Sequence, residues 1–380
     1  MTLPTPTRKG NLVFNRTCRT LVLLLLTLAM GCDDDTATGP LPEDERSFLE
    51  GTEEDPQIGL VVASLGRTVT LFQLGDPAER RTVPLGASSS VTPVGLAVRG
   101  TRVLVPLGNA ASVALIDAEA EGVERFFLFP SGNTSGSAFL NDGAALVSNL
   151  ITDQVGRVEF DQEADAIEVV VDVAPAPTDI VVVGDRAFVV SGNLDENFAP
   201  LGNGVVTVLD GATLEVEGTI DTGDTNPQYA ALGPDGLLYV VNTGNYFDPG
   251  TMAVIDPSTL ELVDLIEGVG VGPGAITIDA QGLAYISGFF LGTVVYDTGA
   301  GAFLRGPENP VCAPIAGGGC RGASHARAER GGDVYQTFFG SPSEGLAPFT
   351  FVYEAGTFAL ADSIAAGEGP AAVAIEVFEN

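Results

Sequence analysis

Short runs of apolar residues alternate with small and polar residues along most of this chain. From Ile58 onward, runs of β-branched and aliphatic residues are separated by Gly, Asn, Asp and Pro. This pattern is typical of many strands joined by tight turns. One strand closes on an acidic residue and recurs as ALID, VEFD, TVLD, AVID, VVYD and FVYE, whose last residues are Asp117, Asp161, Asp210, Asp256, Asp297 and Glu354. Successive copies lie 44, 49, 46, 41 and 57 residues apart, which is the period of a β-propeller blade.

The repeat from 226 to 268 divides into four predicted strands. In order these are QYAAL, LLYVVN, TMAVID and LELVDLI, which we call strands A to D. A GPDG turn joins A to B, a longer loop joins B to C, and a PST turn joins C to D. Asp256 begins that last turn, where a carboxylate can accept hydrogen bonds from the backbone two residues on. Turn geometry therefore explains the recurring acidic residue before any catalytic role is needed.

The two ends of the repeat region set the number of blades. Residues 60–85 supply only three strands, and the missing strand A is found at 369–377 as GPAAVAIEV. We therefore predict an all-β fold, a seven-bladed β-propeller of four-stranded blades over residues 58–380. The C-terminal strand would pair into the first blade, close the ring and remove the exposed sheet edges. These 323 residues give about 46 residues to each blade, within the range of such repeats.

Several stretches resemble the YVTN-type repeat of bacterial β-propellers. They are LYVVNTGN at 238–245, MAVID at 252–256 and GTIDTGDTNP at 218–227. The resemblance implies an exported or surface-tethered propeller and supplies no catalytic residue. Propellers of the WD type fit less well, because the chain has no Trp and a single His.

The amino terminus predicts export. Residues 1–31 hold four basic residues, no acidic residue and an apolar run from Leu21 to Met30, the composition of a signal peptide too short to span a bilayer. The boundary resembles a bacterial lipoprotein signal, in which Cys32 would become the lipid-attached N-terminus. An ordinary secretory signal and an uncleaved anchor are the alternatives. Residues 32–57 follow as a predicted acidic, disordered tether, with ten acidic residues between 33 and 56.

The charge of the chain bears on its partners. The sequence has 17 basic and 50 acidic residues, and removing residues 1–31 leaves 13 basic against the same 50, a net charge of −37. Nucleic acid is not expected as a partner, because its phosphates would be repelled. Lys9 is the only lysine and lies in the leader, so Schiff-base chemistry through a lysine is excluded. We expect a monomer that contacts a membrane through its lipid anchor only.

The sequence lacks the residue sets of several enzyme classes, and we expect no cofactor. Haem attachment needs Cys-x-x-Cys-His, multicopper centres need several His, and tryptophan-derived quinones need Trp. A Ser-His-Asp triad would have to use His325, the single imidazole, for which a packed or solvent-facing position is the simpler interpretation. A metal-assisted, lactonase-like hydrolase would need several carboxylates or amides at the mouth of the central channel. Its weak candidates are Asp179 and Glu376, both in predicted strands A.

Two cysteines remain beyond the leader and Cys32, namely Cys312 and Cys320. In an exported chain this pair predicts one disulfide, which would stabilise by roughly 2 to 3 kcal/mol. A metal site that includes His325 is the rival interpretation, with three ligands at most. The pair lies in a Pro- and Gly-rich insertion at 305–324. We expect a disulfide-pinned surface loop, of the kind that often carries function.

The loops between strands B and C give the best candidate for a binding face. They begin with small polar residues and, in blades four to seven, contain or adjoin aromatic residues. The candidate residues are Phe198, Asn242, Asn245, Tyr246, Phe247, Phe289, Phe290, Phe338 and Phe339. If exposed, these aromatics would form an apolar arc of the kind that binds a partner. The alternative is that they fill gaps between blades, because consecutive Phe residues on a strand point one in and one out.

These observations favour a lipid-anchored, non-enzymatic propeller that displays a binding or interaction face in the bacterial cell envelope, toward the periplasm or the exterior. Its partner would be an envelope protein, a glycan or a small ligand. The first alternative is the metal-assisted hydrolase at the channel mouth. The second is a rigid scaffold that spaces other envelope components.

Overall fold

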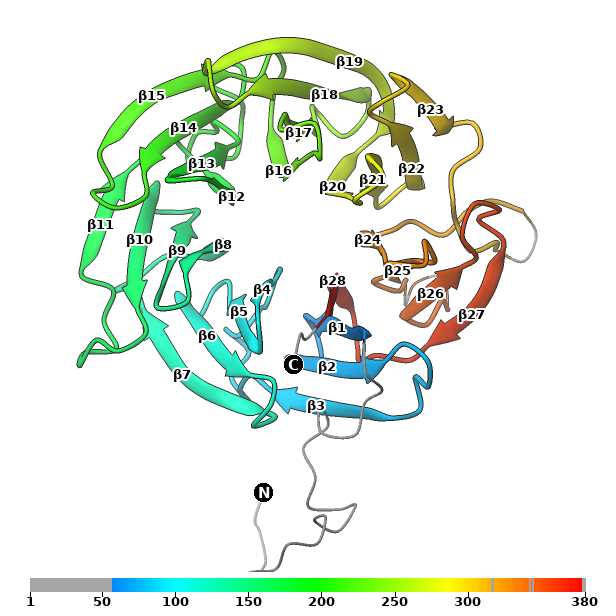
Figure 1. The fold of residues 1–380 in the computed structure, drawn as a ribbon, viewed down its shortest axis with the longest axis horizontal. Coiled ribbons are helices and arrows are strands. Elements are labelled where there is room, and N and C mark those ends of the chain that lie inside the picture. Colours follow the sequence, from blue (N-terminus) through cyan, green and yellow to red (C-terminus); the bar gives the residue numbers. More distant parts are fainter. Residues whose placement is uncertain (1–56, 316–317, 342, 344, 378–380) are drawn as a thin grey trace, which may run out of the picture. The chain divides into compact units, whose positions relative to one another are not determined.

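The structure is a computed structural model that describes residues 57–315, 318–341, 343 and 345–377. The predicted signal peptide, Cys32 and the predicted tether up to residue 56 lie outside the described residues. In the described part, 28 strands form seven four-stranded antiparallel sheets. The sheets are arranged as blades around a ring (Figure 1). The predicted seven-bladed β-propeller is confirmed.

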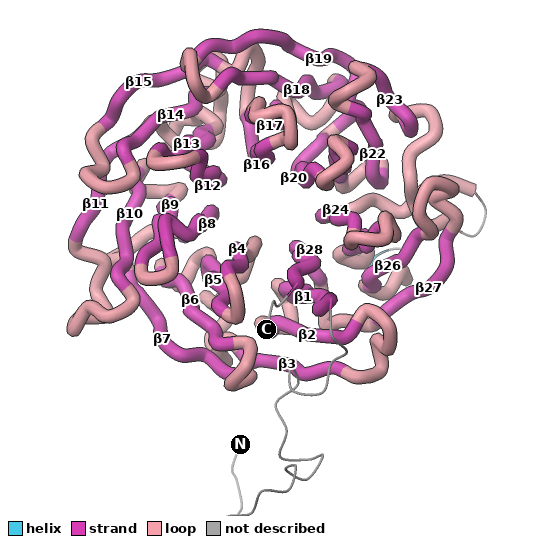
Figure 2. Tube along the Cα trace, viewed as in Figure 1, coloured by secondary structure: helices cyan, strands magenta, loops and turns pink. Residues whose placement is uncertain are grey.

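Each blade places its four strands in order from the centre of the ring to its outer edge (Figures 1 and 2). The first three blades contain, from inside to outside, β28 (Pro370–Val377), β1 (Gln57–Ala63), β2 (Thr68–Gln73) and β3 (Arg80–Pro84); β4 (Ala97–Arg99), β5 (Arg102–Pro106), β6 (Ser112–Asp117) and β7 (Gly122–Leu128); and β8 (Thr134–Asn141), β9 (Ala144–Asn149), β10 (Gln154–Glu159) and β11 (Val169–Asp172).

The remaining four blades follow the same order. They contain β12 (Pro177–Val183), β13 (Arg186–Ser191), β14 (Val205–Asp210) and β15 (Val216–Asp221); β16 (Pro227–Leu232), β17 (Leu238–Asn242), β18 (Pro249–Asp256) and β19 (Glu261–Val271); β20 (Pro273–Ile278), β21 (Leu283–Gly288), β22 (Gly292–Asp297) and β23 (Ala302–Arg305); and β24 (His325–Ala328), β25 (Val334–Phe338), β26 (Phe349–Tyr353) and β27 (Leu360–Ile364).

The ring is closed by its two ends. The C-terminal strand β28 pairs antiparallel with β1, with Glu376 opposite Ile58 and Ala374 opposite Leu60. Blade one therefore takes its innermost strand from the far end of the sequence, as predicted. Because β28 follows blade seven in the sequence, these backbone hydrogen bonds hold the end of the chain in blade one. They also cover the edge of β1 that would otherwise be open.

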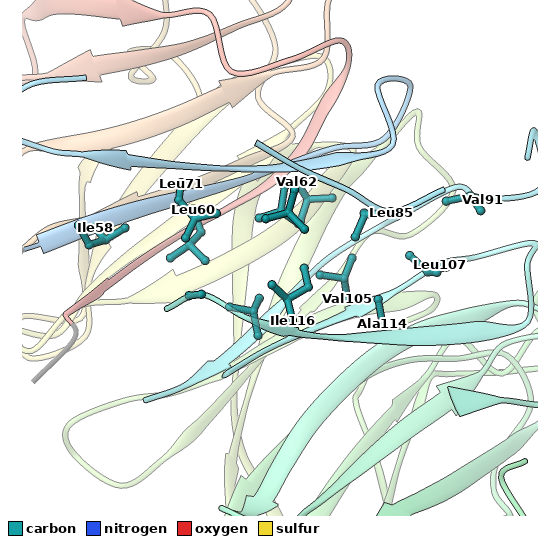
Figure 3. Close-up of a cluster of buried hydrophobic side chains, with 14 residues drawn as sticks. Ile58, Leu60, Val62, Leu71, Leu85, Val91, Val105, Leu107, Ala114 and Ile116 are labelled. Carbon is teal, nitrogen blue, oxygen red and sulfur yellow. The ribbon is translucent and has the colours of Figure 1, made fainter. Parts of the chain in front are cut away.

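The hydrophobic core lies between blades. Seven clusters of buried apolar side chains fill the seven interfaces between neighbouring blades. Between blades one and two, for example, Leu71, Val105 and Ile116 belong to one cluster (Figure 3). The second strand of a blade is covered on both faces, which explains why β9 and β17 are buried throughout. Each fully buried Leu or Ile side chain contributes about 1.5 to 3 kcal/mol.

In blades two, four, five and six the recurring acidic residue is the last residue of the third strand, whereas Asp161 and Glu354 lie just after theirs. Asp117 Oδ1 accepts the backbone N–H of Glu119 at 2.9 Å, and Asp256 Oδ1 accepts that of Ser258 at 2.8 Å. Hydrogen bonds of the same kind lower the pKa of Asp210, led by the backbone N–H of Thr213. These exposed carboxylates therefore hold turns and are already occupied by local donors.

Strand direction places two kinds of connection on the same face of the ring. Because the four strands of a blade are antiparallel, the loop from the second to the third strand and the connection to the next blade both emerge where the innermost strand begins. We call this the B–C face. The turns between the first and second strands, and between the third and fourth, lie on the opposite face. All the predicted aromatic loops therefore share one face of the ring.

Candidate binding site at the channel mouth

The B–C face carries a pocket at the mouth of the central channel, which we call the mouth pocket. Its volume is about 410 Å³. It is lined by B–C loops of blades one, five, six and seven and by the connections that lead into the innermost strands. Five aromatic residues contribute to it: Tyr229, Tyr246, Phe289, Phe290 and Phe339. No described residue of the lining carries a charge, although the chain has 50 acidic residues.

A local turn positions Tyr246 in the B–C loop of blade five. Asn245 Oδ1 accepts the backbone N–H groups of Phe247 and Asp248, each at 2.9 Å, and its Nδ2 donates to Asp248 Oδ2 at 2.8 Å. Within this turn Tyr246 has a φ of 67°, in the left-handed region that a bulky residue rarely adopts. Its side chain stays 49% exposed. The loop therefore holds an aromatic ring in solvent at some conformational cost.

Phe289 and Phe290 are both exposed, at 59% and 70%, so the expectation of one inward and one outward ring is wrong for this pair. The reason is where the strand ends. β21 stops at Gly288, and the N–H of Leu291 donates to the carbonyl of Gly288 in a tight turn. Both Phe residues lie in that turn, where the alternation of a strand no longer applies.

The aromatic residues of blades five to seven are contiguous. A Cβ placed on Gly272 would lie 3.1 Å from the Phe290 ring and 3.9 Å from the Tyr246 ring, so both rings border that glycine. The rings of Phe289 and Phe339 meet edge to face, with centroids 6.3 Å apart. The B–C loops of three successive blades thus build one apolar surface.

Other predicted residues do not join the mouth pocket. Phe198 and Phe247 are exposed, at 55% and 87%, but do not line it. Phe338, the last residue of β25, is buried and packs against Phe351, so the alternative interpretation applies there. Asn242 is buried, and its Nδ2 donates to the Thr222 carbonyl and to Thr251 Oγ1, each at 3.1 Å. Asn242 therefore joins strands and does not lie on the binding face.

The channel beneath the mouth is lined by innermost strands and contains titratable groups. Its cavity of about 390 Å³ includes Asp179 on β12, Tyr229 on β16 and His325 on β24. Asp179 Oδ2 accepts the backbone N–H of Ala230 at 3.0 Å, which links blades four and five. Burial raises the pKa of Asp179 to about 6, although backbone N–H groups of Ala230 and Ile180 favour its carboxylate form. Burial, with the nearby Asp179 charge, also raises the pKa of the Tyr229 phenol.

His325 lines the same channel but does not form a triad. Burial lowers its pKa to about 4, with a further contribution from the Arg327 charge. Its Nδ1 is buried and has no hydrogen-bond partner among the described residues. The neighbouring Ser324 Oγ is likewise buried and unpartnered within the described part of the chain. An imidazole that is neutral and not hydrogen-bonded to Ser or Asp matches the prediction of a packed His.

The two predicted metal candidates are not brought together. Asp179 is the third residue of β12, and Glu376 is the seventh of the eight residues of β28. Since all innermost strands run in the same direction through the ring, these two positions lie toward opposite ends of the channel. Within the described ranges, no group of three or more His, Cys, Asp or Glu residues has the geometry to hold a metal ion.

The insertion before blade seven forms a wall beside the mouth. The predicted disulfide is present, since Cys312 is bonded to Cys320 with Cα atoms 5.6 Å apart. The N–H of Arg321 donates to the carbonyl of Ala313 at 2.9 Å, which continues the closure of the loop. Gly322 then lies so close to the backbone of Phe289 that a Cβ would be 1.7 Å from its carbonyl oxygen. A side chain at 322 would push the insertion away from the aromatic turn.

Sequence reasoning did not single out three residues that shape this region. Tyr229 was visible only as part of a strand, Arg321 only as a neighbour of Cys320, and Ser324 only as a neighbour of His325. Tyr229 lines both the mouth pocket and the channel. Arg321 could have been identified as a candidate from the sequence, because it is a basic residue next to the predicted disulfide in an otherwise acidic chain.

No family model matches this chain, and no curated protein matches it. Among solved structures it is similar to the hydrazine synthase of Kuenenia stuttgartiensis, with a TM-score of 0.58 and 13% identity over 77% of this chain and 96% of that chain. It is also similar to a functionally unknown protein from Desulfotomaculum acetoxidans, with a TM-score of 0.61 and 14% identity over 84% and 98%. Similarity at this identity shows the fold alone. Over the described residues, no helix has the length and apolar character needed to cross a membrane.

Proposed function

We propose that this protein is an exported, non-enzymatic binding module that takes an apolar ligand, or an apolar part of one, into the mouth pocket. One observation carries the proposal. Aromatic side chains from three successive blades converge on an uncharged pocket of about 410 Å³, and three of them, Tyr246, Phe289 and Phe290, are exposed. Concave apolar sites of this size, with a few polar groups at their edge, are typical of small-molecule sites.

The exposed rings are not needed by the fold. Phe289 and Phe290 lie in a turn, and their exposures of 59% and 70% leave most of their surface in contact with water. Transfer of such surface from water into an apolar contact is favourable by about 25 cal/mol per Å². A ligand that covers these rings gains that free energy, whereas folding does not. Contiguous exposed apolar surface on a highly charged protein typically marks an interaction site.

Titration with the neutral apolar dye Nile red tests this proposal. The combined variant Tyr246→Ser, Phe289→Ser and Phe290→Ser is expected to weaken dye binding at least about tenfold, a loss of about 1.4 kcal/mol. Ile151→Ser is the matched control, because Ile151 is 56% exposed on the B–C loop of blade three, outside the mouth pocket. Equal dye binding by wild type and the combined variant, at equal thermal stability, would overturn the proposal.

We further infer that the propeller belongs to the YVTN type and is tethered to a membrane through a lipid on Cys32, facing the periplasm or the exterior. Support comes from the apolar leader that ends at Cys32 and from the acidic segment that follows. In cells labelled with an alkyne fatty acid, wild type is expected to carry label and to sediment with membranes, whereas Cys32→Ser carries none. Label retained by Cys32→Ser would overturn the anchor.

One observation favours a second candidate, the hydrolase at the channel mouth. Asp179 lines the channel with a pKa raised to about 6 by burial, and perturbed carboxyl groups in clefts are frequent in active sites. The candidate predicts hydrolysis of lactones or related esters that Asp179→Asn abolishes. A screen in which wild type and Asp179→Asn are equally inactive would leave the binding module as the sole proposal.

A further inference from the structure

A second pocket adjoins the mouth on its outer side, which we call the side pocket. Its volume is about 500 Å³, and its described lining includes Phe289, Phe290, Phe338, Phe339 and Arg321. Phe289, Phe290 and Phe339 also line the mouth pocket, so these rings lie where the two cavities adjoin. A ligand in one pocket can therefore extend over the ridge into the other. Arg321 is the only charged residue in the described lining of either pocket.

Arg321 is held in an apolar environment without a carboxylate. Its guanidinium carbon lies 5.2 Å from the centre of the Phe338 ring and 5.8 Å from that of Phe351. Its Nη1 is buried and has no hydrogen-bond partner among the described residues. Arg321 as a whole is half-buried. A partly desolvated cation in this position gains from a hydrogen-bonded anion, because part of the water that would otherwise solvate it has been removed.

Arg321 differs from half of the arginines in the described part of this acidic protein. In the described part of the chain, six arginines form ion pairs with Asp or Glu: Arg81, Arg99, Arg102, Arg125, Arg157 and Arg186. Arg321 has no such pair within these ranges, although acidic residues greatly outnumber basic ones. The described walls of the side pocket supply rings, small residues and hydroxyl groups but no carboxylate.

The insertion fixes Arg321 on both sides. Cys320, its direct neighbour, is bonded to Cys312, and the Arg321 N–H donates to the carbonyl of Ala313 at 2.9 Å. On its other side, Gly322 contacts the backbone of Phe289, and the N–H of Ala323 donates to the carbonyl of Gly288 at 2.9 Å. The cation and the aromatic ridge are therefore held at a fixed spacing before any ligand arrives, which reduces the ordering cost of binding.

We propose that the ligand is a small organic acid with an apolar body. Its carboxylate binds Arg321 in the side pocket, and its apolar part lies across Phe289 and Phe290 into the mouth pocket. The inference rests on the proposed binding function and adds the chemical class of the ligand. A guanidinium recognises a carboxylate with two parallel N–H donors, and the aromatic stack beneath it keeps the planar group oriented.

Calorimetric titration with two matched probes tests the inference. The probes are 4-phenylbutanoate, an apolar carboxylate, and 4-phenylbutanol, which has the same apolar body without the charge. At pH 7.5 wild type is expected to bind the acid roughly 10- to 100-fold more tightly than the alcohol, because hydrogen bonds to charged groups are worth that much. Equal affinities, or binding of neither probe, would overturn the inference.

Variants identify the group responsible. Arg321→Met keeps an unbranched apolar side chain against Phe338 and is expected to remove the preference for the acid while leaving affinity for the alcohol within about twofold. Arg321→Lys is expected to retain part of the preference, because it keeps the charge but loses the planar fork. Arg305→Met is the matched control, since that guanidinium also lies over a ring, 5.3 Å from the centre of Phe358, on the outer strand β23.

The outcomes separate the two proposals. If both probes bind equally and Phe289→Ser with Phe290→Ser removes both, the mouth is a binding site but does not select a carboxylate. If Arg321→Met preserves the preference for the acid at unchanged thermal stability, the carboxylate is bound elsewhere and the inference fails. If neither probe binds, the carboxylate inference fails, and the Nile red titration decides the mouth pocket independently.

Discussion

The mouth of the channel and its interior share Tyr229 but are built in different ways. Loops build most of the mouth, and most of their aromatic rings stay exposed. Innermost strands build the interior, where Asp179 and His325 are held with pKa values shifted by burial. Interior residues are therefore constrained by the fold, whereas rings such as Phe290 remain mostly exposed. Changes at the mouth should therefore alter binding, and changes in the interior should alter stability.

The largest expected effect is on protein stability, and it distinguishes a phenylalanine in the core from one at the mouth. Phe338 is buried in the core between blades six and seven, whereas Phe290 is 70% exposed. Phe338→Ala is expected to lower the free energy of unfolding by about 3 to 5 kcal/mol, because it leaves a cavity. Phe290→Ala is expected to change it by no more than about 0.5 kcal/mol. Urea unfolding measures both, and a large loss for Phe290→Ala would break the comparison.

The second prediction concerns the pH dependence of stability in the interior. The folded pKa of Asp179 is raised to about 6, so the folded state binds more protons and this group's contribution falls as pH rises from about 4 to 6. The folded pKa of His325 is lowered to about 4, so the unfolded state binds more protons and its contribution rises between about pH 4 and 6.5. In wild type the two contributions oppose each other.

Single variants are expected to separate them. Relative to wild type, Asp179→Asn should be more stable at pH 7 than at pH 4 by up to about 3 kcal/mol, and His325→Gln should show the opposite difference of similar size. Urea unfolding at the two pH values gives both numbers. Phe290→Ala, at the mouth, serves as the control with no pH-dependent difference. Two variants with differences of the same sign would contradict the assignment.

The third prediction addresses the wall that joins the two regions. Replacing Cys312 and Cys320 by Ser is expected to cost roughly 2 to 3 kcal/mol of unfolding free energy, because the loop they close becomes free in the unfolded chain. The same change should weaken binding of 4-phenylbutanoate more than that of 4-phenylbutanol, since Arg321 follows Cys320 directly. Denaturant unfolding and calorimetry measure the two effects. An unchanged affinity for 4-phenylbutanoate would show that the insertion is not part of the binding site.

The smallest expected effect lies outside the mouth. Phe198 has a φ of 60° and is 55% exposed, in a turn where Asp195 Oδ1 accepts the N–H groups of Asn197 and Ala199. Phe198→Gly should relieve the left-handed strain and raise the unfolding free energy by up to about 1 kcal/mol. Nile red binding should not change. A clear loss of dye binding would extend the site into blade four.

The sequence was sufficient for the fold because a propeller blade is a local unit. The strand that ends in Asp256 and the turn after it can be recognised from a few consecutive residues. The closing strand at 370–377 was identified because the first blade lacked its innermost strand. The exposure of tandem Phe residues could not be predicted in the same way. It depends on whether the strand ends before the pair, as at Gly288, or within it, as at Phe338.

Convergence across the ring is the part that sequence could not supply. Asp179, Tyr229 and His325 belong to blades four, five and seven and share a channel only after the ring has closed. Arg321 looks like a loop residue until its ring contacts with Phe338 and Phe351 are known. Periodicity identifies which residues lie in innermost strands or B–C loops. It does not tell which of them meet, because neighbouring blades are about 46 residues apart.

The most direct test of the central claim is a crystal structure of the protein soaked with 4-bromobenzyl alcohol, with the bromine located by anomalous scattering. The crystals must leave the B–C face open to solvent. A bromine peak is expected in the mouth pocket, among Tyr246, Phe289 and Phe290, and it should be absent in crystals of the variant with Ser at these three positions. A peak only on the outer strands, or an empty mouth at saturating probe, would contradict it.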